Sequence, residues 1–298
     1  MIDLRSLHGC GIVALTNFVY REKLQVLNPR ACIVLVPFRG GIAPECDRSL
    51  RALEKMGYVV KRIGGYAAID QGRCQMATDA YYAGYEETMW IDSDVAFEPA
   101  DVQRLREQDE AIICGAYPVK GKRALACHVM PGTQSVTFGR EGSTIEILYA
   151  GAGFLFVKRF VYESMLRRLR LPICNQRFGS PLVPFFAPMQ VPTRQGLWYL
   201  AEDFAFCHRA RQCGFKIMAD TRIRLWHMGT QLCSWDTPEC SGPRYDTFTL
   251  NLTDERSDPE SNIHGQASEF GAINLDSKDA VLLQDGNLDS LSREHAHG

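Results

Sequence analysis

The first part of the chain alternates between short continuous apolar runs and stretches whose apolar residues lie at helical spacing. Residues 31–36 form a continuous, β-branched apolar run, which is typical of a strand buried on both faces. Leu50, Leu53 and Met56 lie at helical spacing within residues 45–56, and Gly57 ends that pattern. Residues 58–63 predict a second strand. A strand, a helix and a strand within about 35 residues form a βαβ unit, which predicts a parallel sheet.

Similar patterns predict further elements along the chain. We expect helices over residues 71–83, 99–108 and 204–213, and strands over 88–91, 110–117, 151–157, 215–219 and 223–226. Weak alternation with interspersed glycines predicts hairpins over 124–147. Residues 172–196 contain five prolines and no sustained period, so we expect a long irregular segment there. The predicted fold class is α/β, a single domain over residues 31–245 with a mostly parallel central sheet, preceded by an N-terminal extension over residues 1–30.

The end of the chain differs from the rest in composition. From Asn251 onward there are ten acidic and three basic residues, and the only apolar cluster is Val281-Leu282-Leu283. Residues 246–298 are therefore predicted to be an acidic tail that is disordered or loosely docked. Because the whole chain has a net charge of -2, the body before the tail is mildly basic. That balance suits an anionic ligand such as a nucleotide and is too small to indicate nucleic acid binding.

Cysteine usage and hydropathy bear on the compartment. The 11 cysteines are odd in number and never spaced as CxxC, which favours a reduced, cytoplasmic protein with buried thiols. No apolar run is long enough to span a bilayer, so we expect no integral membrane segment. The apolar residues 9–20 are interrupted by Thr16 and Asn17 and predict a buried element rather than a signal peptide.

Asp92 and Asp94 follow directly after the predicted strand 88–91. In an extended chain, residues two apart point to the same side about 6.6 to 7 Å from each other. Two carboxylates at that distance repel one another unless a positive charge lies between them, and Mg²⁺ or Mn²⁺ carrying phosphate oxygens is the natural partner. The alternative is an ordinary turn, because Asp-Ser-Asp is common turn composition. Ligands of open α/β sheets gather at the carboxyl ends of strands, which favours the metal interpretation.

Three other segments carry candidate site residues, each with a structural alternative. Gly151 and Gly153 precede a strand and permit close approach of the backbone to a ligand, or else form a tight hairpin. Glu202 and Asp203 begin a helix, where the dipole favours carboxylates whatever their function. His227 follows a short strand, a position at which a lone histidine is more often a surface or core residue than a ligand.

The four segments occur in one order: Asp92-Ser93-Asp94, Gly151-Ala152-Gly153, Glu202-Asp203 and His227-Met228-Gly229. Over residues 31–230, this ordered set resembles the GT-A glycosyltransferases, most closely the family-2-like enzymes that use sugar nucleotides. The resemblance implies a GT-A, Rossmann-like fold and a divalent-metal-dependent enzyme with a DxD motif. It implies Mn²⁺ or Mg²⁺ as the cofactor and a nucleotide-diphosphate sugar as the donor, with a UDP-sugar favoured. The acceptor is unknown, whether a saccharide, a lipid-linked molecule or a protein.

The same resemblance implies roles for single residues. Asp92 looks like the residue that contacts the nucleotide ribose and the coordination shell of the metal, and Asp94 looks like the direct metal ligand. His227 is similar to a histidine that completes the metal shell in some members, and the glycines are similar to a segment beside the donor sugar. Asp203, with Glu202 beside it, matches the general base of inverting members. Arg73 matches more loosely a basic residue near the nucleotide.

Arg39-Gly40-Gly41 stands where many relatives have an acidic residue that holds uracil. Arg39 is therefore a candidate nucleotide contact, and the identity of the donor's nucleobase stays open.

The chemistry of sugar transfer agrees with the other roles. A cation stabilises a diphosphate leaving group, and a carboxylate accepts the proton of the acceptor hydroxyl. A glycoside hydrolase would need two carboxylates flanking the scissile bond, which one Asp-Ser-Asp pair does not supply. Two alternatives remain: a sugar-1-phosphate nucleotidyltransferase and a non-catalytic module that binds nucleotide sugars.

Overall fold

The computed structural model describes residues 27–120, 124–193, 196–229, 232–235 and 246–252. Residues 1–26 of the predicted N-terminal extension lie outside these ranges. Residues 253–298 of the predicted tail, including Val281-Leu282-Leu283, lie outside them as well. None of the described helices is long and apolar enough to span a lipid bilayer.

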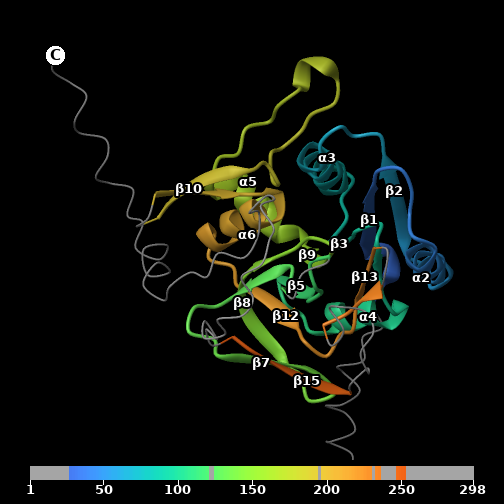
Figure 1. Cartoon of the computed structure of the whole chain (residues 1–298). Coiled ribbons are helices and arrows are strands. Elements are labelled where there is room, and N and C mark those ends of the chain that lie inside the picture. Colours follow the sequence, from blue (N-terminus) through green and yellow to red (C-terminus); the bar gives the residue numbers. More distant parts are fainter. Residues whose placement is uncertain (1–26, 121–123, 194–195, 230–231, 236–245, 253–298) are drawn as a thin grey trace, which may run out of the picture.

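An eight-stranded sheet forms the centre of the molecule, in the order β2-β1-β3-β9-β5-β12-β8-β6 (Figure 1). Its strands are β1 (Cys32–Phe38), β2 (Val59–Gly64), β3 (Glu87–Ile91), β5 (Ile112–Gly115), β6 (Cys127–Val129), β8 (Thr144–Ala150), β9 (Phe154–Lys158) and β12 (Ile217–Asp220). The βαβ unit is confirmed, because β1 pairs in parallel with both β2 and β3. Only β8 and β9 run against the other six strands, so the sheet is mostly parallel and the α/β fold class is confirmed.

Helices cover both faces of this sheet and make a three-layer, Rossmann-like arrangement (Figure 1). On one face lie α2 (Pro44–Lys55) and α4 (Pro99–Glu107), and on the other lie α3 (Ile69–Tyr82), α5 (Arg159–Arg168) and α6 (Glu202–Gln212). The strand β1 shows how the sequence produces these layers. Cys32, Val34 and Val36 pack toward α2 and α4, whereas Ile33 and Leu35 pack toward α3, α5 and α6. Full burial of such an aliphatic side chain contributes about 1.5 to 3 kcal/mol.

Smaller sheets surround the main one. β4 (Val95–Ala96), β13 (Trp226–Met228) and β14 (Leu232–Cys233) form one, β10 (Met189–Thr193) and β11 (Gly196–Leu200) a second, and β7 (Ser135–Gly139) and β15 (Thr247–Asn251) a third. β15 lies beyond the domain boundary predicted at residue 245, and it pairs along its length with β7. Residues 247–251, which the sequence placed in the predicted tail, are therefore paired with a strand that lies within the predicted domain.

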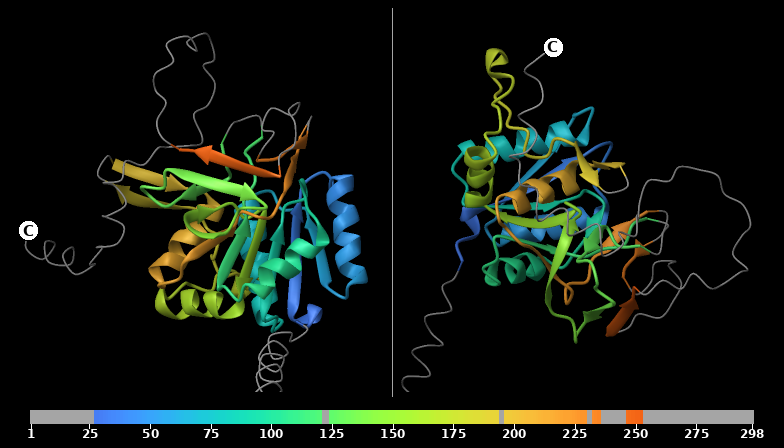
Figure 2. Two further views of the ribbon diagram at one scale, coloured as in Figure 1. Left: turned by 90° about the horizontal axis from the view of Figure 1, so that it is seen from below. Right: turned by 90° about the vertical axis from the view of Figure 1, so that its left-hand side faces the viewer.

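The predictions for the irregular parts of the chain were correct only in part. Within residues 124–147, β6 and β8 are antiparallel neighbours as expected, but β7 between them pairs with the distant β15. Residues 172–188 are irregular as predicted, and their short 3-10 helix η2 (Gln176–Phe178) lies at the tip of a loop that projects from the body (Figure 2). The strands β10 and β11 were missed, because prolines and glycine break their alternation. The helix α5 was missed as well.

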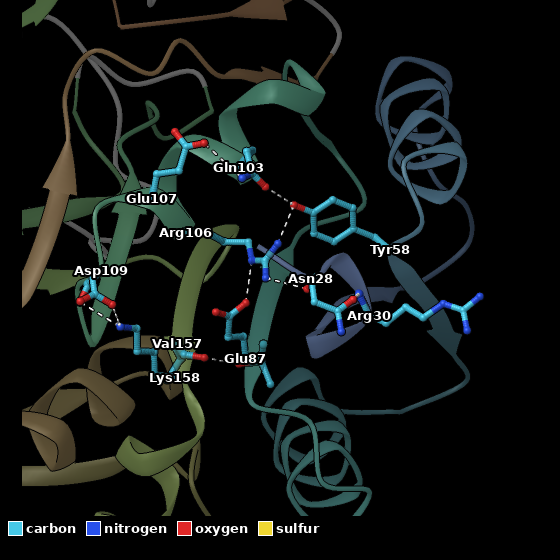
Figure 3. Close-up of polar contacts among 11 residues, drawn as sticks. Asn28, Arg30, Tyr58, Glu87, Gln103, Arg106, Glu107, Asp109, Val157 and Lys158 are labelled. Atoms are coloured by element: carbon cyan, nitrogen blue, oxygen red, sulfur yellow. Dashed lines mark hydrogen bonds and ion pairs between the residues drawn. The ribbon is translucent and has the colours of Figure 1, made fainter. Parts of the chain in front are cut away.

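A buried arginine ties together the amino ends of the strands, at the edge opposite the predicted site (Figure 3). Nε of Arg106 on α4 donates to Glu87 at 2.6 Å, and its two terminal nitrogens donate to the hydroxyl of Tyr58 and to the carbonyl oxygen of Asn28. Because a buried charge needs a partner, this network satisfies Arg106 and fixes α4 against β1 and β3.

Candidate active site

The turn after β3 brings the predicted carboxylate Asp94 next to the predicted histidine His227. Asp92 and Val95 close the turn through a backbone hydrogen bond of 3.1 Å. The following strand β4 pairs with β13, which places His227 opposite Val95. Oδ1 of Asp94 lies 3.6 Å from Nε2 of His227, and Oδ2 of Asp94 is paired with Lys120. Asp94 and His227 are far apart in sequence, and the fold brings them together.

The hydrogen-bond partner of Nδ1 determines which nitrogen of the neutral His227 ring carries the hydrogen. Nδ1 lies 2.9 Å from the carbonyl oxygen of Pro118. A carbonyl oxygen only accepts, so Nδ1 must carry the hydrogen. In the neutral ring, Nε2 then presents a lone pair to Asp94, and two electron-rich atoms face each other. A proton or a metal ion between them relieves that repulsion, and a backbone carbonyl on the other ring nitrogen is the usual support of a metal-binding histidine.

The same partners determine the charge of Asp94. Partial burial by itself would raise the pKa of this carboxyl group, but His227 in its protonated form and the charge of Lys120 outweigh it and lower the pKa to about 2. Asp94 is thus a carboxylate at neutral pH, which is the form that binds a metal ion.

The two protein atoms are near the separation that one divalent ion requires. Two ligands at right angles around an ion with bonds of about 2.1 Å lie about 3 Å apart, somewhat less than the 3.6 Å between Oδ1 of Asp94 and Nε2 of His227. No group of three or more His, Cys, Asp or Glu side chains suited to a metal occurs in the part of the chain that the structure describes. An ion here would therefore have few protein ligands and would take the remaining ones from water or substrate, as Mg²⁺ often does.

Asp92 has a different partner from Asp94. Its Oδ1 accepts a hydrogen bond of 2.6 Å from Nη2 of Arg73 on α3, and Nε of Arg73 lies 3.5 Å from Glu202. The Arg73 side chain is only 3% exposed and lies over the ring of Trp90. Burial alone would lower the pKa of Arg73, but the charges of Asp92 and Glu202 outweigh it and raise this pKa. Arg73 therefore links Asp92, from the predicted Asp92-Ser93-Asp94 motif, to Glu202, from the predicted Glu202-Asp203 motif.

Asp203, the predicted base, lies half-buried beside this arginine at the start of α6. Burial and, after it, the adjacent charge of Glu202 raise the pKa of Asp203, Arg73 and a hydrogen bond from the backbone of Phe204 oppose the rise, and the net pKa is about 7. The position at a helix start would by itself lower this pKa, and here burial and Glu202 outweigh that effect. A carboxyl group with a pKa near neutrality is suited to general base catalysis.

The two predicted glycines lie against a tyrosine that sequence reasoning missed. The Gly153 N–H donates to the hydroxyl of Tyr117 at 2.9 Å, and the Gly153 carbonyl accepts from the Asp92 N–H. A Cβ atom at Gly153 would lie 2.3 Å from the Tyr117 hydroxyl and 2.9 Å from Oδ2 of Asp92, and one at Gly151 would lie 2.8 Å from the same hydroxyl. The glycines therefore make room for Tyr117 next to Asp92.

Tyr117 lies at the centre of the site. Its ring packs edge-on against His227 at 5.3 Å between centroids. Burial raises the pKa of the Tyr117 hydroxyl well above its ordinary value, and the charges of Asp92 and Asp203 add to the rise. Tyr117 follows the carboxyl end of β5, and this place at the predicted edge of the sheet was a signal that could have identified it.

Arg39 lies in an exposed bend after β1. A backbone hydrogen bond of 2.8 Å from Ala43 to Ser93 ties the loop that contains Arg39 to the Asp92-Ser93-Asp94 turn. Within the described ranges, no hydrogen bond or ion pair joins the Arg39 side chain to the carboxylates of the site. The structure thus brings together Asp92, Asp94, His227, Arg73, Glu202, Asp203, Gly151 and Gly153, and leaves Arg39 at the rim.

No family model matches the chain, and no curated protein matches it. Among solved structures, the chain is similar to A197 from STIV, with 17% identity, a TM-score of 0.46, and coverage of 69% of this chain and 90% of that one. It is also similar to GalNAc-T7 crystallised with UDP, GalNAc and Mn²⁺, with 11% identity, a TM-score of 0.39, and coverage of 68% of this chain and 44% of that one. A third similar structure is that of the inositol-1-phosphate CTP transferase from T. maritima, with 14% identity, a TM-score of 0.30, and coverage of 64% of this chain and 66% of that one.

Proposed function

We propose that this protein is a metal-dependent glycosyltransferase that moves a sugar from a nucleotide-diphosphate sugar to an acceptor hydroxyl. One observation carries the proposal. Nε2 of His227 lies 3.6 Å from the carboxylate of Asp94, while Nδ1 is committed to a backbone carbonyl, in a site that also contains Asp203, a carboxyl group with a pKa of about 7. The first pair suits a cation that carries phosphate, and the second group suits removal of a proton.

The donor half of the site consists of Asp94, His227, Asp92 and Lys120. Asp94 and His227 would hold Mn²⁺ or Mg²⁺, which when bound neutralises the charge that develops on a diphosphate leaving group. Asp92, held by Arg73, has its second oxygen available to accept a hydrogen bond from a ribose hydroxyl. Lys120 is exposed and would bring a second positive charge to the diphosphate. A UDP-sugar remains the favoured donor.

The acceptor half of the site depends on Asp203. Its carboxylate would accept the proton of the attacking hydroxyl, and its pKa near the working pH is the best compromise between being ionised and being basic. Glu202 acts on Asp203 through its charge, which raises the pKa of Asp203, while Arg73 keeps Glu202 in place. A base on the acceptor side implies a single displacement and an inverted anomeric configuration.

A donor screen tests this function. The full chain is incubated with Mn²⁺ and a panel of nucleotide-diphosphate sugars, with and without saccharide acceptors, and released nucleoside diphosphate is measured. We expect release with at least one donor and a product of inverted configuration by NMR. Pyrophosphate release from a nucleoside triphosphate and a sugar-1-phosphate would instead identify a nucleotidyltransferase. Saturable donor binding with no release in either assay would identify a non-catalytic binding module.

A further inference from the structure

Arg73 on α3 and Arg106 on α4 are two buried arginines with similar surroundings at opposite edges of the sheet. The guanidinium carbon lies over an aromatic ring in both cases, 5.6 Å from the ring centre for Arg73 and 5.4 Å for Arg106. Each side chain also donates a hydrogen bond of 2.6 Å to a carboxylate, which is Asp92 for Arg73 and Glu87 for Arg106. Arg106 therefore serves as a matched reference for Arg73.

The two arginines differ in how many of their nitrogens are paired. All three side-chain nitrogens of Arg106 donate hydrogen bonds (Figure 3). In Arg73 only Nη2 does so, and within the described residues Nε and Nη1 have no hydrogen-bond partner although both atoms are buried. Unpaired buried N–H groups lower the stability of a fold. The contacts of Arg106 therefore stabilise the fold, whereas the place of Arg73 requires another explanation.

The sequence places Arg73 between the two halves of the proposed site. Trp90 lies two residues before Asp92, and residues two apart in an extended chain point to the same side. A guanidinium over the Trp90 ring therefore also reaches Asp92, and its Nε lies 3.5 Å from Glu202. Asp92 belongs to the donor half, and Glu202 precedes Asp203 in the acceptor half. One guanidinium thus connects a carboxylate of each half.

Burial keeps a ligand away from Arg73 itself. Its side chain is 3% exposed, whereas those of Asp92 and Glu202 are 28% and 17% exposed. A ligand can therefore touch the two carboxylates but not the guanidinium behind them. The guanidinium is a rigid, planar fork whose N–H groups point in fixed directions. Its place therefore determines the places of both carboxylates.

We propose that Arg73 is a positioning residue that couples the donor half to the acceptor half: its single guanidinium holds Asp92 and Glu202 together, and no substrate touches it. This inference rests on the proposed transferase function. Because both carboxylates depend on one rigid group, a change at Glu202 is transmitted to Asp92, although no direct contact between the two is needed. Variants at Arg73 and Glu202 should therefore have non-additive effects on the donor half.

The charge of Arg73 also acts on the proposed base, Asp203. The charged and titratable groups that face Asp203 are Glu202, Arg73, Asp92, Tyr117 and Cys207. Burial raises the pKa of Tyr117 well above its ordinary value and that of Cys207 to about 12, so both are neutral near pH 7. Arg73 is the cation of this set and lowers the pKa of Asp203. Arg106 is not in the set and makes a suitable control.

The first test is a double-mutant cycle between Arg73→Lys and Glu202→Gln, with the affinity for UDP in the presence of Mn²⁺ measured by calorimetry. Lysine keeps the charge, but its ammonium is a point charge that does not hold two carboxylates as a fork does. We expect Glu202→Gln to weaken UDP binding by about fivefold in the wild type, and to have little further effect in Arg73→Lys. The control Arg106→Lys should lower the melting temperature and leave UDP binding unchanged. Additive effects in the cycle would overturn the coupling.

The second test needs neither a donor nor turnover. The carboxyl carbons of ¹³C-labelled aspartate are titrated by NMR between pH 5 and 9 in EDTA, and the Asp203 signal is identified by its loss in Asp203→Asn. We expect the Asp203 midpoint to rise by about one pH unit or more in Arg73→Gln, because a neighbouring cation is removed. In Arg73→Lys and Arg106→Gln it should stay near the wild-type value. If Arg73→Gln does not fold, Arg73→Gln/Glu202→Gln, which removes opposite charges together, is compared with Glu202→Gln.

An unmoved midpoint on removal of Arg73, or an equal rise in Arg106→Gln, would overturn the proposal. If UDP does not bind, the titration alone decides whether Arg73 acts on the acid pair. A donor screen without turnover, together with a raised midpoint in Arg73→Gln, would reject the transferase function and retain the contact of Arg73 with the acids. The two proposals therefore fail separately.

Discussion

Nε2 of His227 faces Oδ1 of Asp94 at 3.6 Å, while Nδ1 of the same ring is committed to a backbone carbonyl. If a divalent ion binds between them, Asp94→Asn and His227→Ala should each lower metal-stimulated turnover by roughly 10²-fold or more, because they remove the charge stabilisation at the leaving group. Manganese affinity, measured by electron paramagnetic resonance, should fall in parallel. Glu163→Gln, a charge change on α5 at a residue that is ion-paired with Arg167, is the control. Full metal-stimulated turnover in both variants would exclude this pair as the metal site.

The raised pKa of Asp203 predicts a pH profile. Turnover of the wild type should fall about tenfold per pH unit below about 7, because the base must be ionised to accept a proton. Asp203→Asn keeps the shape and the hydrogen bond to Phe204, and should lower turnover by roughly 10² to 10⁴ with donor binding nearly unchanged. The measurement is the initial rate of nucleoside diphosphate release between pH 5 and 9. Near wild-type rates in Asp203→Asn, or a product that keeps the donor's anomeric configuration, would refute the inverting mechanism.

The same residue should lower stability at neutral pH. A carboxyl group whose pKa is higher in the folded than in the unfolded chain favours folding when protonated, so this contribution is present below about pH 4 and is lost as the pH rises through about 7. Asp203→Asn stays neutral at every pH. We therefore expect it to raise the free energy of unfolding by about 2 to 4 kcal/mol at pH 8 and by little at pH 4. Urea unfolding at both pH values measures this difference, and an equal change at both would show that ionisation is not the cause.

Gly153 should not tolerate a side chain. In Gly153→Ala the new Cβ would lie 2.3 Å from the Tyr117 hydroxyl and 2.7 Å from its ring carbon Cζ, and Tyr117 is buried and in contact with His227. We expect a loss of about 1 to 3 kcal/mol in stability from overpacking, together with a loss of turnover as Tyr117 and Asp92 shift. Gly41→Ala is the matched control, because nothing lies within 4 Å of a Cβ at that position. Thermal unfolding compares the two, and equal melting temperatures would show that Tyr117 has room to move.

The sequence was sufficient to predict the βαβ unit and the edge of the sheet at which Asp92 and Asp94 lie. The continuous apolar run in β1 and the helical spacing in α2 are local signals, and they correctly predict parallel pairing with β2 and β3. The place of Asp92 and Asp94 follows from the same rule, because both come directly after a buried strand. His227 could be assigned to the same site only through the resemblance, since nothing local marks the residue against which it packs.

Properties that depend on burial could not be predicted from local pattern. The position of Asp203 at a helix start suggested a lowered pKa, whereas burial and the charge of Glu202 raise it. The contact between Arg73 and Asp92 depends on how deeply α3 sits on the sheet, and the pairing of β7 with β15 joins segments with more than a hundred residues between them.

The pairing of β4 with β13 determines when the site can form during synthesis of the chain. Asp92 and Asp94 leave the ribosome early, whereas His227 follows only after the strands of the main sheet have been made. Closing so long a loop is slow unless the sheet already holds its ends near each other. A nascent chain that ends before β13 therefore contains the acidic turn without the imidazole, and the site should become complete only after the sheet has folded.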